Sequence, residues 1–377
     1  MRIREILFHD FRSFRGERRV SFVDPLTNAV RPVSVLAGSN GSGKTTLLEA
    51  LEALLSLLLN PDKQPPKLIN EVLESGLIVL TLEVSDADFA GRARDFGSAP
   101  AGKSDLLRIG VGKRELVSAE LLLPESNRLC LISEPSNGRR TDKYMGMMTV
   151  SLRHAALDMQ RDKADLHGGF IYFPYDRQLG VIAGGAIEPP PIEHDWLVRY
   201  SSANRWKGSL EQLWVWQNYL DLEQQAKGES QSGNLRRFVT AVEEVLGAGR
   251  AISVDEGRVQ VPASWSQDRD PRVLLRLDQL PSGEQQVLLL FGELARRRRS
   301  GALIAIDEVE NCLHPTLQRL VMWNLNRIAR EWDAQIIVAT HSLEVIRSVR
   351  GSAFINLDYP EDRFDLPAPD EAGESTQ

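Results

Sequence analysis

Cysteine is scarce in this sequence, and the N-terminus lacks a secretory pattern. The two cysteines among 377 residues, Cys130 and Cys312, make neither a disulfide framework nor a thiolate metal site. Two thiols without a spacing pattern suit a reducing cytosol. The chain opens Met-Arg-Ile-Arg-Glu, with no apolar run before a cleavage site. We therefore expect no signal peptide and a cytoplasmic location.

Long hydrophobic runs are also missing. The longest apolar segment, 47–59, is interrupted by Glu49, Glu52 and Ser56, and it stops at Pro61. A transmembrane helix needs about 20 apolar residues. We therefore predict that this segment is a buried helix and that the protein has no membrane partner.

The chain has no excess of positive charge. Lys and Arg number 45 against 52 Asp and Glu, which gives a net charge of −7. Without an overall basic field, any contact with DNA must use a local patch. Neither an internal repeat nor a long heptad run is present, so no long coiled coil is expected. The apolar content of 42% and the charged content of 26% fit an ordinary globular protein.

Periodicity and turn residues predict an α/β fold. Strands are expected at 2–9, 17–23, 33–37, 77–84, 115–123, 170–173, 302–306 and 336–339, with a hairpin across 251–262. Helices are expected at 45–59, 209–246 with a break near 228–233, 282–299 and 315–331. Loops are expected at 91–104 and 134–143, and a Gly/Pro-rich linker at 181–195. The acidic segment 360–377 is expected to be disordered.

A glycine-rich segment separates the strand 33–37 from the helix 45–59. Its sequence GSNGSGKT, residues 38–45, fits the phosphate-loop (Walker A) pattern, and both flanks are of the required type. The glycines let successive backbone N–H groups point at phosphates, and the helix adds its positive dipole end. Lys44 is predicted to act in catalysis at the β- and γ-phosphates, and Thr45 to ligate Mg²⁺. The predicted nucleotide contacts are Asn40, Gly41, Ser42, Gly43, Lys44, Thr45 and Thr46. A glycine turn without a ligand is the disfavoured alternative.

Two carboxylates end a buried apolar strand. The run 303–306 leads directly into Asp307 and Glu308, and buried carboxylates are costly unless they are paired or used. Asp307 is predicted to hold Mg²⁺, directly or through water. Glu308 is predicted to be the general base that polarises the attacking water. The alternative is a pair of acids that caps the next turn.

A histidine lies at the tip of the following predicted strand. His341 is preceded by the apolar run 336–339 and Thr340, and ligands bind beyond the carboxyl ends of parallel strands. It is therefore predicted to bond a γ-phosphate oxygen or the attacking water. Taken alone, such a histidine is more often structural. The order of the three motifs favours the catalytic role and predicts an ATP-hydrolysing or ATP-switched protein.

These motifs resemble those of ABC-type ATPase heads of the SMC, RecF and OLD class, including compact stand-alone ATPases of bacterial defence systems. Residues 10–14, DFRSF, are similar to the N-terminal "NFRSF" segment of these heads. Residues 280–286, LPSGEQQ, are similar to their signature motif, and 307–315, DEVENCLHP, to their "DEPExxLHP" run. The resemblance covers about 1–60 and 275–350, and no motif in the middle region contributes to it.

The resemblance implies a P-loop NTPase with a two-lobe head, built from a mixed sheet core and a helical lobe. It implies that Arg12 touches the nucleotide. It also implies a head-to-tail homodimer, with each ATP held between the phosphate loop of one subunit and the signature segment of the other. The signature residues expected at the nucleotide are Ser282, Gly283 and Glu284. Pro281 stands where the family usually has serine, and Ser282 follows one place later.

The resemblance also implies a glutamine that senses Mg²⁺ between the lobes. Gln178 is the best candidate, and an ordinary exposed loop is an equally good interpretation. The expected organisation is an ATPase lobe at 1–84, an inserted region at 85–170, and a linker and helical lobe at 171–275. The signature, Walker B and histidine part of the ATPase lobe is expected at 276–359.

Two functions follow as expectations. The first is an ATPase, using ATP and Mg²⁺, that acts on or senses DNA in DNA repair or antiviral defence. The alternative is a low-turnover nucleotide switch that controls a separately encoded effector such as a nuclease. An ATPase subunit of a membrane transporter is disfavoured because a long insertion separates Lys44 from the signature segment.

An arginine run and an aromatic cluster are expected to have structural roles and not to form binding surfaces. The run Arg296–Arg299 is expected to be the solvated last turn of a helix, where cations suit the dipole. The aromatic set Trp206, Trp214, Trp216 and Tyr219 is expected to pack in a helical core.

Overall fold

The structure is a computed structural model. It describes residues 1–59, 67–84, 105–117, 128–132, 168–180, 184–191, 196–202, 205–228, 233–247, 249–266, 273–349 and 351–358. The loops predicted at 91–104 and 134–143 and the tail at 360–377 lie outside the described residues.

A six-stranded sheet forms the centre of the molecule. Its order is β14-β3-β13-β12-β7-β8, and every neighbouring pair is parallel. The strands are β3 (Val33–Ala37), β7 (Phe170–Phe173), β8 (Leu197–Arg199), β12 (Leu303–Ile306), β13 (Gln335–Ala339) and β14 (Phe354–Asn356). The inner strands are buried along their whole length and mostly apolar, because both faces of the sheet are covered. In β12, Leu303 and Ala305 enter one core, while Ile304 and Ile306 enter the other.

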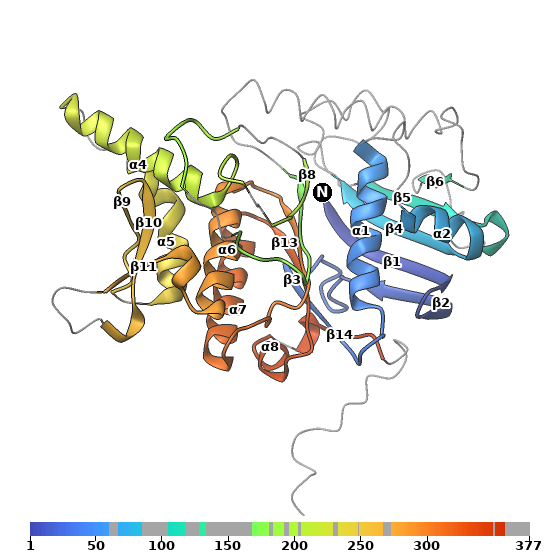
Figure 1. Ribbon diagram of the computed structural model, residues 1–377. Helices are drawn as coiled ribbons and strands as arrows, with labels where there is room; N and C mark the ends of the chain where they lie inside the picture. The colour runs from blue at the N-terminus through green and yellow to red at the C-terminus, as the bar shows by residue number, and fades with distance from the viewer. Residues whose placement is uncertain are drawn as a thin grey trace, which may run out of the picture.

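A five-stranded sheet lies beside the central sheet, with helix α1 between them (Figure 1). Its order is β2-β1-β4-β5-β6, antiparallel except for the pair β5 and β6. The strands are β1 (Arg2–Phe11), β2 (Phe14–Ser21), β4 (Leu77–Val84), β5 (Asp105–Gly112) and β6 (Arg128–Ile132). Helix α1 (Lys44–Leu59) is the buried helix predicted from the long apolar segment, since it packs against strands of both sheets. The shorter helix α2 (Lys67–Ser75) follows it.

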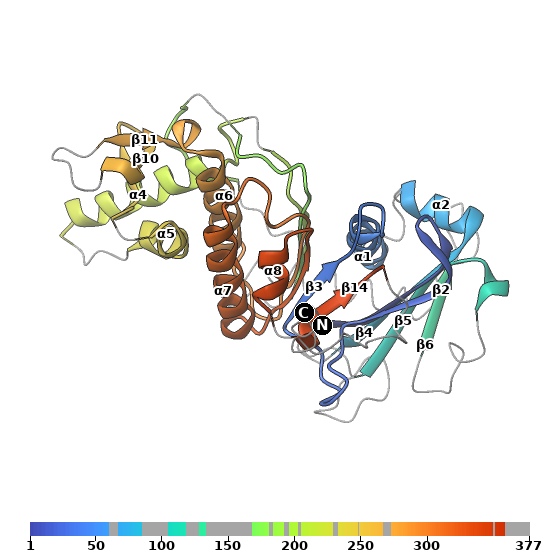
Figure 2. The same ribbon diagram turned by 90° about the horizontal axis from the view of Figure 1, so that it is seen from below.

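Helices α6 (Ser282–Arg296), α7 (Pro315–Glu331) and α8 (Leu343–Arg347) lie on the opposite face of the central sheet (Figure 2). Helices α4 (Leu210–Ala226) and α5 (Asn234–Leu246) lie beyond α6 and α7, farther from the sheet. A small antiparallel sheet of β9 (Ser253–Asp255), β10 (Arg258–Pro262) and β11 (Leu274–Arg276) follows α5 and packs against α4. Helices α4 and α5 and this small sheet form the helical lobe, and the fold is the expected α/β P-loop NTPase with a two-lobe head.

Most long elements agree with the sequence-based prediction. The strands 33–37 and 170–173, the helix 315–331 and the hairpin within 251–262 are confirmed. The longest helices in the described part, α4 and α7, have 17 residues each. No helix among the described residues is long and apolar enough to span a membrane.

The short elements and some ends differ from the prediction. The predicted strand 115–123 is wrong at its start, because Arg114–Leu116 form a 3-10 turn; residues 118–123 are outside the described part. Helix α6 ends at Arg296, three residues before the predicted end. The sequence-based prediction did not include α2, β5, β6, β8, β11, α8 or β14.

The two predictions about surface-like residues need correction. Arg296 donates to the carbonyl of Gly208 at 2.7 Å, Arg297 pairs with Glu293, and Arg299 is buried. Only Arg298 of the run is exposed, so the prediction of a fully solvated helix end is wrong. Trp214 is fully buried, as expected, but Tyr219 is 41% exposed.

Candidate nucleotide site

Four loops meet at one edge of the central sheet. Strands β3, β13, β12 and β7 are consecutive neighbours and parallel, so their carboxyl ends share that edge. The phosphate loop follows β3, Asp307 follows β12, and Thr340 follows β13. The three motifs recognised in the sequence are therefore brought together by the strand order.

The phosphate loop has a backbone that suits glycine. Gly41 and Gly43 have φ values of +84° and +101°, a region that L side chains rarely adopt. A Cβ at Gly43 would lie 2.5 Å from the ring of Phe14. The loop therefore packs directly on the DFRSF segment.

Lys44 lies over its own loop. Its Nζ donates to the carbonyls of Gly38 and Ser39, at 2.9 Å each. Burial lowers the pKa of Lys44, while neighbouring carboxylates oppose this effect. The amine is thus held at the mouth of the loop, where a phosphate oxygen can replace a carbonyl as its acceptor.

The predicted magnesium ligands are adjacent. Thr45 Oγ1 donates to Asp307 Oδ2 at 2.8 Å, and Asp307 is only 1% exposed. Burial raises the pKa of Asp307, whereas the hydrogen bond from Thr45 lowers it. Neighbouring ligands of an octahedral Mg²⁺ ion lie about 2.9 Å apart, given metal–oxygen distances of about 2.0–2.1 Å. The two oxygens therefore fit the ion.

The rest of the coordination shell would come from substrate and water. Within the described ranges, no group of three or more His, Cys, Asp or Glu residues is arranged to hold a metal. Mg²⁺ usually binds one or two carboxylates together with substrate phosphates and several waters. Two protein ligands, Thr45 and Asp307, are consistent with this mode of Mg²⁺ coordination.

Glu308 sits in a strained turn directly after Asp307. Its φ is +47°, and a non-glycine residue in the left-handed region costs about 1–2 kcal/mol. Its carbonyl accepts a hydrogen bond from Arg177 at 2.8 Å and one from the Asn311 N–H at 3.0 Å. In the described part of the chain, no hydrogen bond or ion pair engages the Glu308 carboxylate, so it remains available to a water molecule.

Glu310 holds the backbone of the histidine motif. Its two carboxylate oxygens accept from Thr340 Oγ1 at 2.8 Å and from the His341 N–H at 2.5 Å. The His341 residue is exposed at this edge of the sheet. Glu310 belongs to the DEVEN segment of the sequence, but its link to His341 was not predicted.

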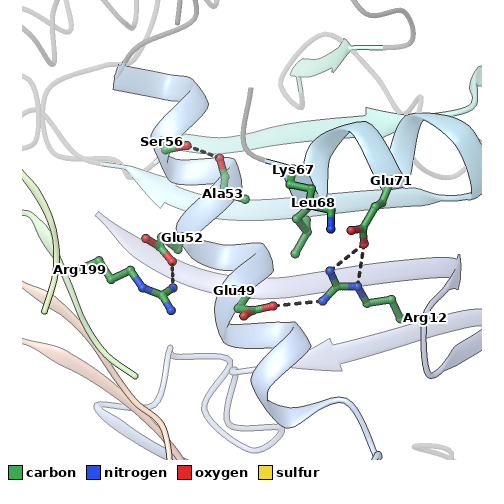
Figure 3. A pocket seen from close by; sticks show the side chains of 9 residues that line it. All are labelled: Arg12, Glu49, Glu52, Ala53, Ser56, Lys67, Leu68, Glu71 and Arg199. Carbon is green, nitrogen blue, oxygen red and sulfur yellow. Dashed lines mark hydrogen bonds and ion pairs between the residues drawn. The ribbon is translucent and has the colours of Figure 1, made fainter. Parts of the chain in front are cut away.

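Arg12 is engaged by carboxylates of α1 and α2 (Figure 3). Its guanidinium donates to Glu49 at 3.1 Å and to Glu71 at 2.7 Å. These residues line a pocket of about 390 Å³ between the two helices and Arg199. In this conformation the Arg12 guanidinium lies between Glu49 of α1 and Glu71 of α2 (Figure 3), and its contact with a nucleotide stays a prediction.

The signature segment begins helix α6. The N–H groups of Ser282, Gly283 and Glu284 lie in the first turn, where a helix offers no internal acceptors. A Cβ at Gly283 would lie 2.8 Å from the carbonyl of Cys312, so the segment packs against the loop after β12. The Glu284 carboxylate is bound by Arg250 of the same chain. Any contact of Glu284 with a nucleotide is therefore left to its backbone.

Gln178 is exposed, whereas its neighbour Arg177 is buried at the acidic strand end. The backbone N–H of Gln178 donates to Ser202 Oγ at 3.1 Å. Arg177 is 3% exposed and donates to the carbonyls of both Asp307 and Glu308. The structure thus brings Arg177 to the acidic strand end, whereas the role of Gln178 in sensing Mg²⁺ stays a prediction.

Asp358 is a contact that the sequence did not indicate. Its carboxylate accepts from the Ser39 N–H and from Ser39 Oγ, at 2.7 Å each. The residue follows β14, the neighbour of β3. Its negative charge therefore lies at the phosphate loop, close enough to act on the Lys44 pKa.

Replacing Asp358 by Asn is expected to tighten ATP binding. The amide oxygen can still accept from Ser39, but the negative charge that opposes a triphosphate is gone, so the Kd should fall by about threefold to tenfold. Titration with a fluorescent ATP analogue measures this change. Asp333→Asn is the control, since Asp333 lies at the opposite edge of the sheet beside Arg2. Weaker binding by Asp358→Asn would show that the carboxylate organises the loop instead.

The fold and the site define a class. A parallel sheet with a phosphate loop after β3, an acidic end of β12 and a helix that begins at the signature-like segment is the arrangement of an ABC-like P-loop ATPase. Two family models match the sequence. One, "AAA domain", covers residues 5–86, and the other, "AAA domain, putative AbiEii toxin, Type IV TA system", covers residues 187–347.

Solved structures provide further comparisons. The SMC head domain from Thermotoga maritima is 13% identical, with 93% of this chain and 92% of that chain covered and a TM-score of 0.39. The Smc head domain with an extended coiled coil bound to the C-terminal domain of ScpA, derived from Pyrococcus furiosus, is 12% identical, with 92% and 91% covered and a TM-score of 0.47. A bacterial ABC transporter cassette, described as dimeric, is 11% identical, with 95% of both chains covered and a TM-score of 0.35.

These structures support no finer assignment, because all three TM-scores are below 0.5. Among curated proteins, the sequence has no match. The class therefore rests on the topology, the site and the two family models. The model over residues 5–86 contains the phosphate loop, and the model over residues 187–347 contains the signature, acidic and histidine motifs.

Proposed function

We propose that this protein hydrolyses ATP as a dimer with two sandwiched nucleotides, and that it acts on or senses DNA in repair or antiviral defence. The observation that carries the hydrolytic role is the cluster at the carboxyl edge of the sheet. Thr45 Oγ1 and Asp307 Oδ2 are 2.8 Å apart. Glu308 follows, and no hydrogen bond or ion pair from another described residue engages its carboxylate. The DNA role is supported by the resemblance to RecF and OLD heads.

In this mechanism the loop 38–45 binds the phosphates through its N–H groups and Lys44. Thr45 and Asp307 would hold Mg²⁺, which neutralises charge on the phosphate oxygens when it is bound. Glu308 accepts a proton from the water that attacks the γ-phosphorus, and ADP leaves with the bridging oxygen. His341, held through its backbone by Glu310, lies where it can donate to a γ-phosphate oxygen.

The signature helix completes the site from the partner subunit. The first turn of α6 offers N–H groups, which bind anions at a helix N-terminus. In a head-to-tail dimer, Ser282 and Gly283 of one subunit would face the γ-phosphate on the other. Each site is then complete only in the dimer, so ATP binding and dimerisation are linked.

Replacing Ser282 by Glu is expected to abolish ATP-induced dimerisation. A glutamate in the first turn suits the dipole of α6, but it places a carboxylate against the partner's γ-phosphate, and the dimer Kd should rise by about tenfold or more. Light scattering with ATP in a Glu308→Gln background measures the mass. Ser282→Ala is the control that removes the hydroxyl without adding charge. An unchanged dimer in Ser282→Glu would contradict the sandwich.

The alternative function is a low-turnover nucleotide switch that controls a separate effector such as a nuclease. It is favoured by Pro281, which precedes α6 where the family usually has serine and provides no side-chain cap. Steady-state turnover with and without duplex DNA separates the two functions. Turnover that DNA raises supports the first function. Absence of turnover in every condition, with ATP binding and dimerisation intact, supports the switch.

A further inference from the structure

Arg177 is a buried cation with no part in the mechanism above. It lies in the loop after β7, four residues beyond Phe173, and is 3% exposed. Its Nη1 donates to the carbonyls of Asp307 and Pro174, and its Nη2 donates to the carbonyl of Glu308. The planar fork of arginine thus reaches two successive carbonyls of the catalytic turn from two nitrogen atoms in a fixed geometry, which the single ammonium nitrogen of lysine does not reproduce.

The free-energy cost of burying the Arg177 charge must be offset by favourable interactions within the protein. Isolated buried cations are strongly unfavourable unless they are paired and hydrogen-bonded. Burial lowers the pKa of Arg177, and the negative charges of Asp307, Glu310 and Glu308 oppose this effect. The guanidinium is therefore tied to the acidic strand end by charge as well as by hydrogen bonds, so its position and that of the turn depend on each other.

The turn that Arg177 holds is the strained one. Glu308 has a left-handed backbone, a state that persists only where the surroundings hold it. The hydrogen bond from Arg177 to the Glu308 carbonyl restrains this conformation. A second link runs from Asn311 Nδ2 to the carbonyl of Tyr175, at 3.1 Å. The loop after β7 is thus hydrogen-bonded to the turn at Asp307 and Glu308 and again at Asn311.

The same loop is bound by the signature helix. Gln286, one turn into α6, donates from Nε2 to the carbonyl of Arg177 at 3.2 Å. Gly283 of the same helix packs against the carbonyl of Cys312. A continuous set of contacts therefore runs from the first turn of α6 through Arg177 to the backbone of Glu308.

We infer that Arg177 is a positioning residue that aims the Glu308 carboxylate, and that Gln286 makes this aim depend on the signature helix. The inference rests on the proposed ATPase function. In a dimer, α6 of one subunit faces the nucleotide of the other, so the contact of α6 with that nucleotide sets the geometry of its own subunit's Glu308. Hydrolysis at the two sites would then be interdependent.

The test compares Arg177→Lys and Gln286→Leu with wild type. Arg177→Lys keeps the charge but loses the planar two-nitrogen fork that fixes the turn, and kcat should fall by about 10- to 100-fold with KM changed less than about threefold. Gln286→Leu keeps the size of the side chain but loses the donor, and kcat should fall by about threefold to tenfold. Since both act on one chain of contacts, the double variant should lose little more than Arg177→Lys alone.

A second readout does not depend on turnover. Amide hydrogen exchange of the segment 305–312 should accelerate in both variants, because the Asn311 N–H is bonded to the Glu308 carbonyl within the turn that Arg177 holds. Gln286→Leu is expected to disturb folding less than Arg177→Lys, since Gln286 is only partly buried. Its exchange can therefore still be measured if Arg177→Lys folds poorly.

The outcomes are distinguishable. If wild type turns over, Glu308→Gln does not, and both variants retain wild-type kcat and exchange, the positioning role is overturned. If both variants lose melting temperature but keep kcat, Arg177 is only structural, which also overturns it. If wild type has no turnover, the proposed function fails. Exchange of 305–312 then decides the inference: acceleration in Gln286→Leu supports the coupling, and unchanged exchange overturns it.

Discussion

Replacing Glu308 by Gln is expected to lower steady-state ATP turnover by about 100-fold or more, because general base catalysis contributes about 10²–10⁴-fold. The amide has the same shape as the carboxylate but cannot accept the proton of the attacking water. The turn should survive, since it is held through the Glu308 carbonyl by Arg177 and not through the side chain. Phosphate release at saturating ATP and a nucleotide Kd are the two measurements.

The matched control is Glu331→Gln at the exposed end of α7. It removes the same charge far from the nucleotide and should leave turnover unchanged. ATP binding by Glu308→Gln should stay within about threefold of wild type, since only the transition state uses the base. If this variant keeps more than a tenth of the wild-type rate, another group removes the proton. Repeating both assays with duplex DNA shows whether DNA acts on the chemical step or on binding.

Replacing Lys44 by Ala is expected to weaken ATP binding by about 30- to 1,000-fold, since hydrogen bonds from a charged group contribute about 1.5–3 kcal/mol each. The Lys44 amine is held over the loop by the carbonyls of Gly38 and Ser39. It is therefore placed in advance for the β- and γ-phosphates. Titration with a fluorescent ATP analogue measures the loss, and ATP should no longer raise the melting temperature.

Lys227→Ala is the control for charge, because this lysine is exposed at the end of α4 and pairs with Glu223. It should bind ATP as wild type does. The free energy of unfolding of Lys44→Ala without ATP should change little, since burial already disfavours the charged amine. Wild-type ATP affinity in Lys44→Ala would mean that the glycine loop does not hold the triphosphate.

Local patterns were sufficient for the long elements and for the parts of the site that are continuous in sequence. The apolar run 303–306 ending in Asp307 and Glu308 is a buried strand followed by carboxylates whatever lies around it. The glycines of 38–45 predict a tight loop for steric reasons alone. By contrast, β8, β11 and β14 have three residues each, too few for a hydrophobic period to appear.

The sequence by itself determined which chemistry is present: a phosphate loop, an acidic strand end, a histidine motif and a signature-like helix start. The tertiary structure alone decided what supports them. Asp358 reaches Ser39 across 319 positions, Arg177 reaches Glu308 across 131, and Arg250 reaches Glu284 across 34. Such contacts depend on which strands become neighbours in a sheet and which helices cover it. Local periodicity does not contain that order, because it reports only which face of each element is buried.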